Sequence, residues 1–118
     1  MINLTQHPAT PDQILAGVVN LPAAIQQQLT TLLTFNEIPS IVTLFGRAKQ
    51  ISRLAVESGE KTAMVGGAGY LMPHLERSLA MEGIRPFHAF SVRISEESVD
   101  SSGTVIKTNV FKHVGFVG

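Results

Sequence analysis

The sequence contains no cysteine and no tryptophan, and its charges are few and balanced. The lack of cysteine excludes a disulfide framework, a thiolate nucleophile and any metal site that uses cysteine ligands. Nine lysines and arginines against nine acidic residues exclude the strong positive charge of a nucleic-acid clamp, so we expect no DNA or RNA partner. Near-zero net charge also removes self-repulsion, which favours a homodimer.

Long apolar segments are missing as well. No stretch approaches the roughly 18 apolar residues that would span a bilayer, so no membrane partner is expected. The first residues lack the basic segment and apolar run of a secretion signal, which predicts a cytoplasmic protein. Lysine and arginine are absent before Arg47, and acidic residues are absent after Asp100. An anionic partner should therefore meet the C-terminal third of the chain first.

Helix caps and hydrophobic periodicity divide the chain into alternating strands and helices. Thr10 and Gln13 form a predicted capping box, Ser40 and Gly59 bound a long helix, and Pro73 falls in the first turn of another. The predicted elements are, in chain order, a strand at 2–4, helices at 11–17, 22–33 and 41–58, a strand at 62–65, a helix ending at Gly83, and strands at 87–94 and 105–117.

This order predicts a single α/β domain over residues 1–118. We expect a three-layer Rossmann-like or flavodoxin-like sheet, mainly parallel, with helices on both faces and a C-terminal antiparallel edge hairpin. On the last strand Phe111 and His113 are predicted to share one face and Lys112 and Phe116 the other, and apolar residues on both faces predict partial cover on each side. Its lysines, Lys107 and Lys112, fit edge residues that discourage aggregation, or contacts to a ligand phosphate.

Ligands of open α/β sheets bind beyond the carboxyl ends of the strands, near a switch in strand order. Three segments are predicted to converge there: residues 5–7 after the first strand, residues 66–70 after the strand at 62–65, and the end of the strand at 87–94. The predicted ligand-binding residues are Thr5, Gln6, His7, Gly66, Gly67, Ala68, Gly69, Tyr70, Ser91 and Arg93.

The small residues 66–69 are the strongest local signal, because a strand that leads through them into a helix exposes unobstructed amide hydrogens to a phosphate. The alternative is a tight turn that simply requires glycine. His7 is the candidate for proton transfer, or else a loop-capping imidazole. The four histidines lack metal-ligand spacing and no Ser-His-Asp triad is supported, so no metal or cofactor is predicted, and His74 and His88 are assigned structural roles.

Four motifs together resemble a known group of proteins. They are Asn3-Leu4-Thr5-Gln6-His7-Pro8, Ala63-Met64-Val65-Gly66-Gly67, Ala89-Phe90-Ser91-Val92-Arg93 and the segment 110–117. The chain resembles small bacterial proteins, found on mobile elements and beside CRISPR loci, whose Rossmann-like fold is related to CARF domains. The resemblance implies a dimer that senses cyclic oligoadenylate, or a metal-independent ring nuclease that cleaves it.

The residues by themselves leave the function open. One hypothesis is a nucleotide-sensing or ring-cleaving protein in which the glycine amides and Arg93 bind phosphate and His7 moves a proton. A second is a non-enzymatic module of a mobile element that binds another protein. A third is a site for a mononucleotide or sugar phosphate at the glycine loop. Binding or an accessory role is favoured over catalysis.

Overall fold

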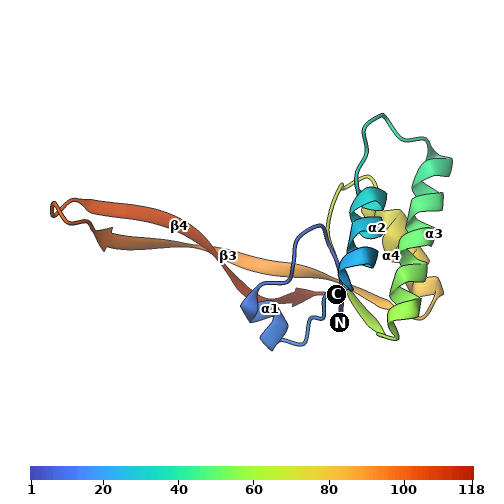
Figure 1. The fold of residues 1–118 in the computed structure, drawn as a ribbon, viewed down its shortest axis with the longest axis horizontal. Helices are drawn as coiled ribbons and strands as arrows, with labels where there is room; N and C mark the ends of the chain where they lie inside the picture. Colours follow the sequence, from blue (N-terminus) through green and yellow to red (C-terminus); the bar gives the residue numbers. More distant parts are fainter.

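The computed structural model describes residues 1–118, which form four strands and four helices around one sheet (Figure 1). The elements are β1 (Ile2–Leu4), α1 (Pro11–Leu15), α2 (Ala23–Leu33), α3 (Ile41–Ser58), β2 (Thr62–Val65), α4 (Met72–Met81), β3 (Arg85–Val99) and β4 (Val105–Val117). The strands lie in the order β1-β2-β3-β4; the first three are parallel, and β4 is antiparallel to β3. The predicted α/β fold with a C-terminal antiparallel hairpin is confirmed. Because spatial order equals chain order, the sheet has no switch point.

The helices begin and end at the predicted caps. The Thr10 hydroxyl accepts a hydrogen bond from the Gln13 amide at 3.2 Å, and the Gln13 side chain accepts one from the Thr10 amide at 3.0 Å. The Ser40 hydroxyl caps α3 by accepting a hydrogen bond from the Thr43 amide, and Gly59 ends the helix with a φ of 80°, a conformation that favours glycine. Bonds between residues only a few positions apart thus mark these boundaries.

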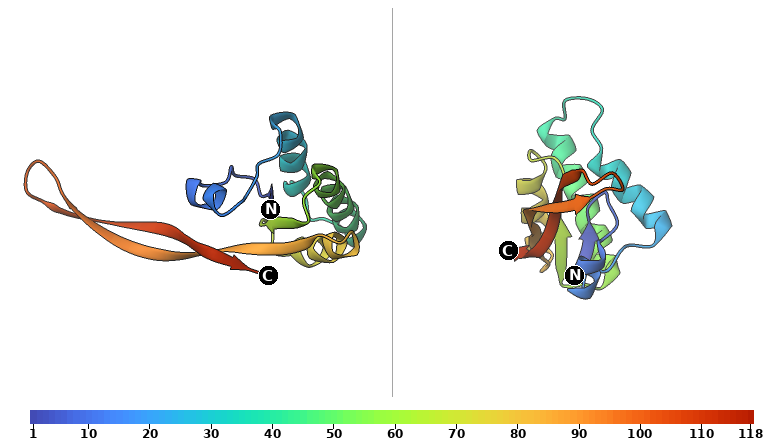
Figure 2. Two further views of the ribbon diagram at one scale, coloured as in Figure 1. Left: turned by 90° about the horizontal axis from the view of Figure 1, so that it is seen from below. Right: turned by 90° about the vertical axis from the view of Figure 1, so that its left-hand side faces the viewer.

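The two faces of the sheet are covered unequally (Figure 2). Ile2, Leu4 and Val65 point into the main core with α2, α3 and α4. Met64, on the alternate side of β2, packs instead against Ala9 and Val18 from the segment around α1. The result is three layers, with the larger helical layer on one face and α1 with its flanking loops on the other.

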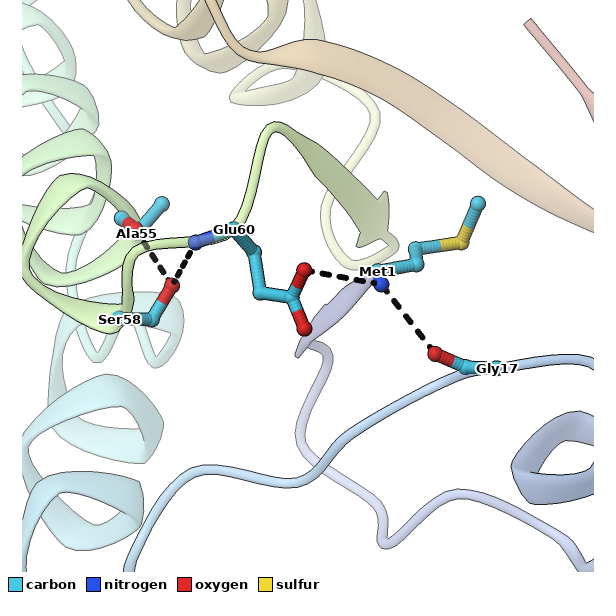
Figure 3. Close-up of polar contacts among 5 residues, drawn as sticks. All are labelled: Met1, Gly17, Ala55, Ser58 and Glu60. Carbon is cyan, nitrogen blue, oxygen red and sulfur yellow. Dashed lines mark hydrogen bonds and ion pairs between the residues drawn. The ribbon is translucent and has the colours of Figure 1, made fainter.

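At the amino ends of β1 and β2 the chain is joined by polar contacts (Figure 3). The Met1 amine lies 3.5 Å from Oε2 of Glu60 and donates a hydrogen bond to the Gly17 carbonyl at 3.2 Å. The Ser58 hydroxyl donates to the Ala55 carbonyl and accepts from the Glu60 amide at 3.3 Å. These contacts tie the turn after α3 to the edge strand, at the end of the sheet opposite to the carboxyl ends of β1 and β2.

The hairpin of β3 and β4 extends far beyond the body of the protein as a two-stranded arm, defined here as residues 91–113 (Figure 1). β2 pairs with β3 only at residues 85–88, so beyond that point the two strands have only each other. The radius of gyration is 17.1 Å, whereas a compact chain of this length has roughly 13 to 14 Å. The prediction that both faces of β4 are partly buried is therefore wrong for a single chain. Phe111, for example, is 71% exposed.

A bulge at the base of the arm changes which residues share a face. Phe90 pairs with Gly115 but Ser91 pairs with His113, so Val114 is an extra residue in β4. The shift moves Phe116 to the face of His113, and their rings lie 4.8 Å apart. The prediction that Phe116 shares a face with Lys112 is wrong, because strict alternation does not anticipate a bulge.

The tip of the arm is closed by the predicted turn. Oδ1 of Asp100 accepts hydrogen bonds from the Ser102 hydroxyl at 2.6 Å and from the amides of Ser102 and Thr104, both at 2.9 Å. Gly103 has a φ of 83°, which the turn requires and glycine adopts freely.

These bonds predict a pH dependence of the turn. The Ser102 side chain, followed by the Thr104 amide, holds the pKa of Asp100 below its ordinary value of 3.8. A lowered pKa means that the stabilising carboxylate is fully present above the unfolded value and is lost as pH falls through the folded value. NMR titration should find this low pKa in the wild type and a higher one in Ser102→Ala; equal values in both would contradict it.

Candidate functional site

A hollow lies at the carboxyl ends of β1 and β2, where they meet β3. Its volume is about 410 Å³. Its lining residues come from the loop after β1, the start of α1, the end of β2 and the neighbouring part of β3. They are Thr5, His7, Pro8, Thr10, Gln13, Met64, Val65, Gly66, His88 and Ala89. Of the residues predicted from the sequence, Thr5, His7 and Gly66 are brought together here.

The buried side chain of Asn3 determines the shape of the loop after β1. Its Oδ1 accepts hydrogen bonds from the Thr5 amide at 2.9 Å and the Thr5 hydroxyl at 2.7 Å. Its Nδ2 donates to the His7 carbonyl at 2.8 Å and to Oδ1 of Asn20 at 2.9 Å. One side chain, 0% exposed, thus satisfies both ends of the segment that carries Thr5 and His7.

Two further amides extend this framework. Oδ1 of Asn20 also accepts from the Ala9 amide at 3.0 Å, and Nε2 of Gln26 donates to the Thr5 carbonyl at 3.2 Å. The loop is therefore attached to β1, to the segment before α2 and to α2 itself. Sequence reasoning missed Asn3, although asparagine inside an apolar strand is unusual and signals a side chain that bonds to nearby backbone.

The small residues at 66–69 can be interpreted either as a phosphate-binding loop or as a tight turn that requires glycine. The structure supports a different interpretation for different residues of this segment. A Cβ at Gly66 would lie 3.3 Å from Cγ2 of Thr5, so glycine lets the two loops approach at the hollow. Gly67 has a φ of 146° and faces Leu33 and Met72, which fits a turn that needs glycine for backbone conformation and close packing. Ala68 packs against the main core. Of this segment, only Gly66 lines the hollow.

Gln6 and Tyr70 lie outside the hollow. Nε2 of Gln6 donates to the Thr34 hydroxyl at 3.3 Å, at the end of α2. Tyr70 packs edge-on against Phe35, with ring centroids 5.3 Å apart, beside a separate cavity of about 590 Å³ at the loop that joins α2 to α3. The predicted convergence is wrong for both, because these exposed side chains follow their own loops toward the helical layer.

Ser91 and Arg93 are also outside the hollow, on the arm. The guanidinium of Arg93 lies 5.3 Å from the centroid of the Phe111 ring across the hairpin. The prediction that these two residues converge with His7 is wrong, because β3 leaves the sheet as soon as its pairing with β2 ends. Lys107, 3.6 Å from Glu97, and Lys112 lie on the same arm.

His88 lies beside the hollow, and its contact with α4 fits the structural role predicted for it. It lines the hollow, and its Nε2 lies 2.5 Å from Oε1 of Glu76 on α4, with both side chains partly exposed. The contact joins β3 to the helical layer next to the cavity. Nothing in the spacing of positions 76 and 88 signals it, because it depends on how α4 packs on the sheet.

Comparison with known proteins places the chain in a family. The model of the uncharacterized protein MJ1673 family matches residues 1–117. The chain belongs to this family. No curated protein and no solved structure matches it. Because the match spans nearly the whole chain, the hollow and the arm both fall within the region that defines the family.

The hollow of this family member is nearly uncharged. Its only ionisable lining residues are His7 and His88, and no lysine or arginine lines it. No group of three or more histidine, aspartate or glutamate side chains is arranged to hold a metal ion. None of the helices is both long and apolar enough to cross a bilayer. Polar recognition in the hollow would come from the Thr10 hydroxyl, imidazole and backbone amides, because the Thr5 hydroxyl already donates to Asn3.

Proposed function

We propose that the hollow beyond β1 and β2 binds a small phosphate-bearing ligand of the nucleotide or sugar-phosphate class. The observation that carries the proposal is the pairing of Thr5 and His7 with Gly66 around a cavity of about 410 Å³, within the usual size range of small-molecule sites. Thr10 adds a second hydroxyl to the lining. Asn3 holds the loop in place before a ligand arrives, which lowers the entropy lost on binding.

The charge of the lining favours a ligand with one phosphate. A polyanion usually meets arginine or lysine, which form the strongest contacts to phosphate oxygens. The Thr10 hydroxyl, backbone amides and the His7 imidazole suit a single phosphate together with polar groups of a sugar or base, since the Thr5 hydroxyl and His88 are already bonded within the chain. A cyclic oligoadenylate, which the family resemblance implies, would need more room and charge than one hollow offers.

The experiment is a thermal-shift series at matched concentrations of adenosine, AMP, ribose 5-phosphate and cyclic tetra-adenylate. A ligand at 100 times its Kd adds about 2.7 kcal/mol, which raises the melting temperature of a chain of this length by about 10 °C. We expect AMP or ribose 5-phosphate to raise it and adenosine to have much less effect. Chromatography of the cyclic tetra-adenylate sample for linear products tests ring cleavage in the same tubes.

Substitutions in and beside the hollow locate the effect. His7→Gln and Gly66→Ala should each raise the apparent Kd of the ligand at least about tenfold and so reduce the thermal shift, because each substitution alters the lining of the hollow. Gly69→Ala is the matched control, since a Cβ there meets nothing within 4 Å. Arg93→Ala should leave the shift unchanged. No response to any phosphate compound, or loss of binding in Arg93→Ala with His7→Gln unaffected, would overturn the proposal.

The arm favours a second function, that of a protein-binding module. Ile106 on the arm and Phe90 at its base are 43% and 50% exposed, and beyond the pairing with β2 the two strands pair only with each other. Exposed apolar surface of this kind marks interaction sites. The two functions use different parts of the molecule, so one can hold without the other.

A further inference from the structure

The two faces of the arm differ in how their charged residues are satisfied. One face carries Arg93, Glu97 and Lys107, which already have partners across the hairpin: Arg93 stacks on Phe111, and Lys107 lies 3.6 Å from Glu97. The other face, named here the apolar face, continues the side of the sheet that α2, α3 and α4 cover in the body. Its residues on the arm are Val92, Ile94, Glu96 and Ser98 from β3, and Ile106, Thr108, Val110 and Lys112 from β4, and the pair Phe90 and Gly115 continues the face at the base of the arm.

The apolar face lacks the layer that its own sheet has elsewhere. In the body, the residues on this side of β1 and β2 are buried beneath the helical layer. On the arm the helices have ended: Val92 and Ile106 are 37% and 43% exposed, and Phe90 at the base of the arm is 50% exposed. A two-stranded ribbon by itself is at best marginally stable in water, so a second layer would stabilise it.

The two charges on the apolar face are placed symmetrically. The rung that pairs Ile94 with Val110 lies midway between them. The next rung of the same face toward the tip holds Glu96, and the next toward the body holds Lys112. Neither residue has an ion-pair partner within the chain. A two-fold axis through the central rung would bring each of these charges next to its opposite in another copy.

We propose that the apolar face of the arm packs against the same face of a second copy, with the two arms antiparallel and the axis at Ile94 and Val110. Glu96 then lies beside Lys112 of the second copy, and the reverse pair forms on the other side of the axis. Ile106 faces the rung of Phe90 and Gly115 of the second copy, where glycine leaves room for it. Layers of this kind pack about 10 Å apart with interdigitated side chains.

The size of the contact sets the strength to expect. The arm has nine residues on each strand, so its face is about 30 Å long and about 10 Å wide at the usual strand rise and spacing. This footprint is small beside a standard interface, which buries about 800 Å² per partner. The proposed dimer should accordingly dissociate in the micromolar range, and measurements should span roughly 1 to 500 µM.

Sedimentation equilibrium of the full chain tests the charge pairs. We expect Glu96→Lys and Lys112→Glu each to raise the dimer Kd about tenfold, because each creates two like-charge contacts across the axis. The double variant exchanges the charges and should restore the wild-type Kd. Ser95→Lys, which places a lysine on the opposite face, is the matched control and should leave the Kd within about twofold.

Cross-linking tests the register, and the absence of native cysteine makes the reaction specific. In Ile94→Cys the two thiols face each other across the axis, so a bismaleimide with a spacer of about 8 Å should join the copies, given the layer spacing of about 10 Å. In Ser95→Cys the thiols point away from the interface, and cross-linking should be at least about tenfold slower.

Four outcomes would overturn the proposal. A wild-type chain that stays monomeric at the highest concentration excludes the dimer. A dimer that Ser95→Lys weakens as much as Glu96→Lys, or a double variant that fails to recover, excludes the assigned face or register. Efficient cross-linking of Ser95→Cys without cross-linking of Ile94→Cys also excludes the assigned face. Circular dichroism of every variant confirms that the body remains folded, and none of these substitutions touches the hollow.

Discussion

Replacing Asn3 with alanine should lower the free energy of unfolding by about 3 kcal/mol, although the change removes only a few atoms. The side chain is fully buried and makes hydrogen bonds to Thr5, His7 and Asn20. Alanine leaves the part-buried Thr5 amide without its acceptor, which by itself costs about 1–3 kcal/mol. It also removes the bonds to Asn20 and to the His7 carbonyl, although that carbonyl keeps the Thr5 hydroxyl as a donor. Urea denaturation followed by circular dichroism measures the change.

Asn3→Asp sharpens this experiment, because it keeps the shape and the Oδ1 acceptor but replaces the donor with an oxygen. That oxygen would face the His7 carbonyl and Oδ1 of Asn20, both acceptors, so the loss of stability at neutral pH should be at least as large. Asn36→Ala in the exposed loop before α3 is the control and should change stability by less than about 0.5 kcal/mol. A change as small as this in Asn3→Ala would show that the polar framework does not hold the loop.

The link between Asn3 and the proposed ligand site follows from the same bonds. Asn3 does not line the hollow, yet it fixes the two residues, Thr5 and His7, that do. Any variant at position 3 that folds should therefore bind phosphate compounds more weakly than the wild type. Binding that survives Asn3→Ala unchanged would mean that the loop conformation is set by other contacts, such as that of Gln26.

The fold was predictable wherever short-range chemistry determines it. Thr10, Ser40 and Gly59 mark the ends of helices through bonds between residues only a few positions apart, and the structure has these bonds. Alternation and turn chemistry likewise predicted the final hairpin. The length of the arm was not predictable, because an apolar strand has the same pattern whether its cover comes from its own chain or from another molecule.

The site shows the same limit. Thr5, His7 and Gly66 come together because parallel strands place their carboxyl ends side by side, which the element order alone implies. Arg93 does not join them, because its position depends on where β3 leaves the sheet. The bulge opposite Ser91 could not be predicted either, because strict alternation of side chains along a strand gives no sign of it. His88 and Glu76 required the packing of α4 on β3, which no motif encodes.

Hydrogen exchange should divide the molecule sharply at the base of the arm. At low micromolar concentration, arm amides that bond across the hairpin should exchange at least about a thousandfold faster than those of β2, because opening the arm exposes little buried surface whereas opening β2 requires loss of the core. Phe87 and His88, which are paired with β2, should be protected like the body although they belong to the same strand as the arm.

Repeating the hydrogen-exchange measurement at several protein concentrations tests the proposed dimer of the arm. Raising the concentration from about 1 to about 500 µM should slow exchange across the arm in proportion to the dimer formed, while β2 should not change, because a partner protects only what it covers. Glu96→Lys should shift this protection to higher concentration and Ser95→Lys should not. Arm amides as slow as those of β2 at the lowest concentration would contradict the prediction, since they would require cover that a single chain does not provide.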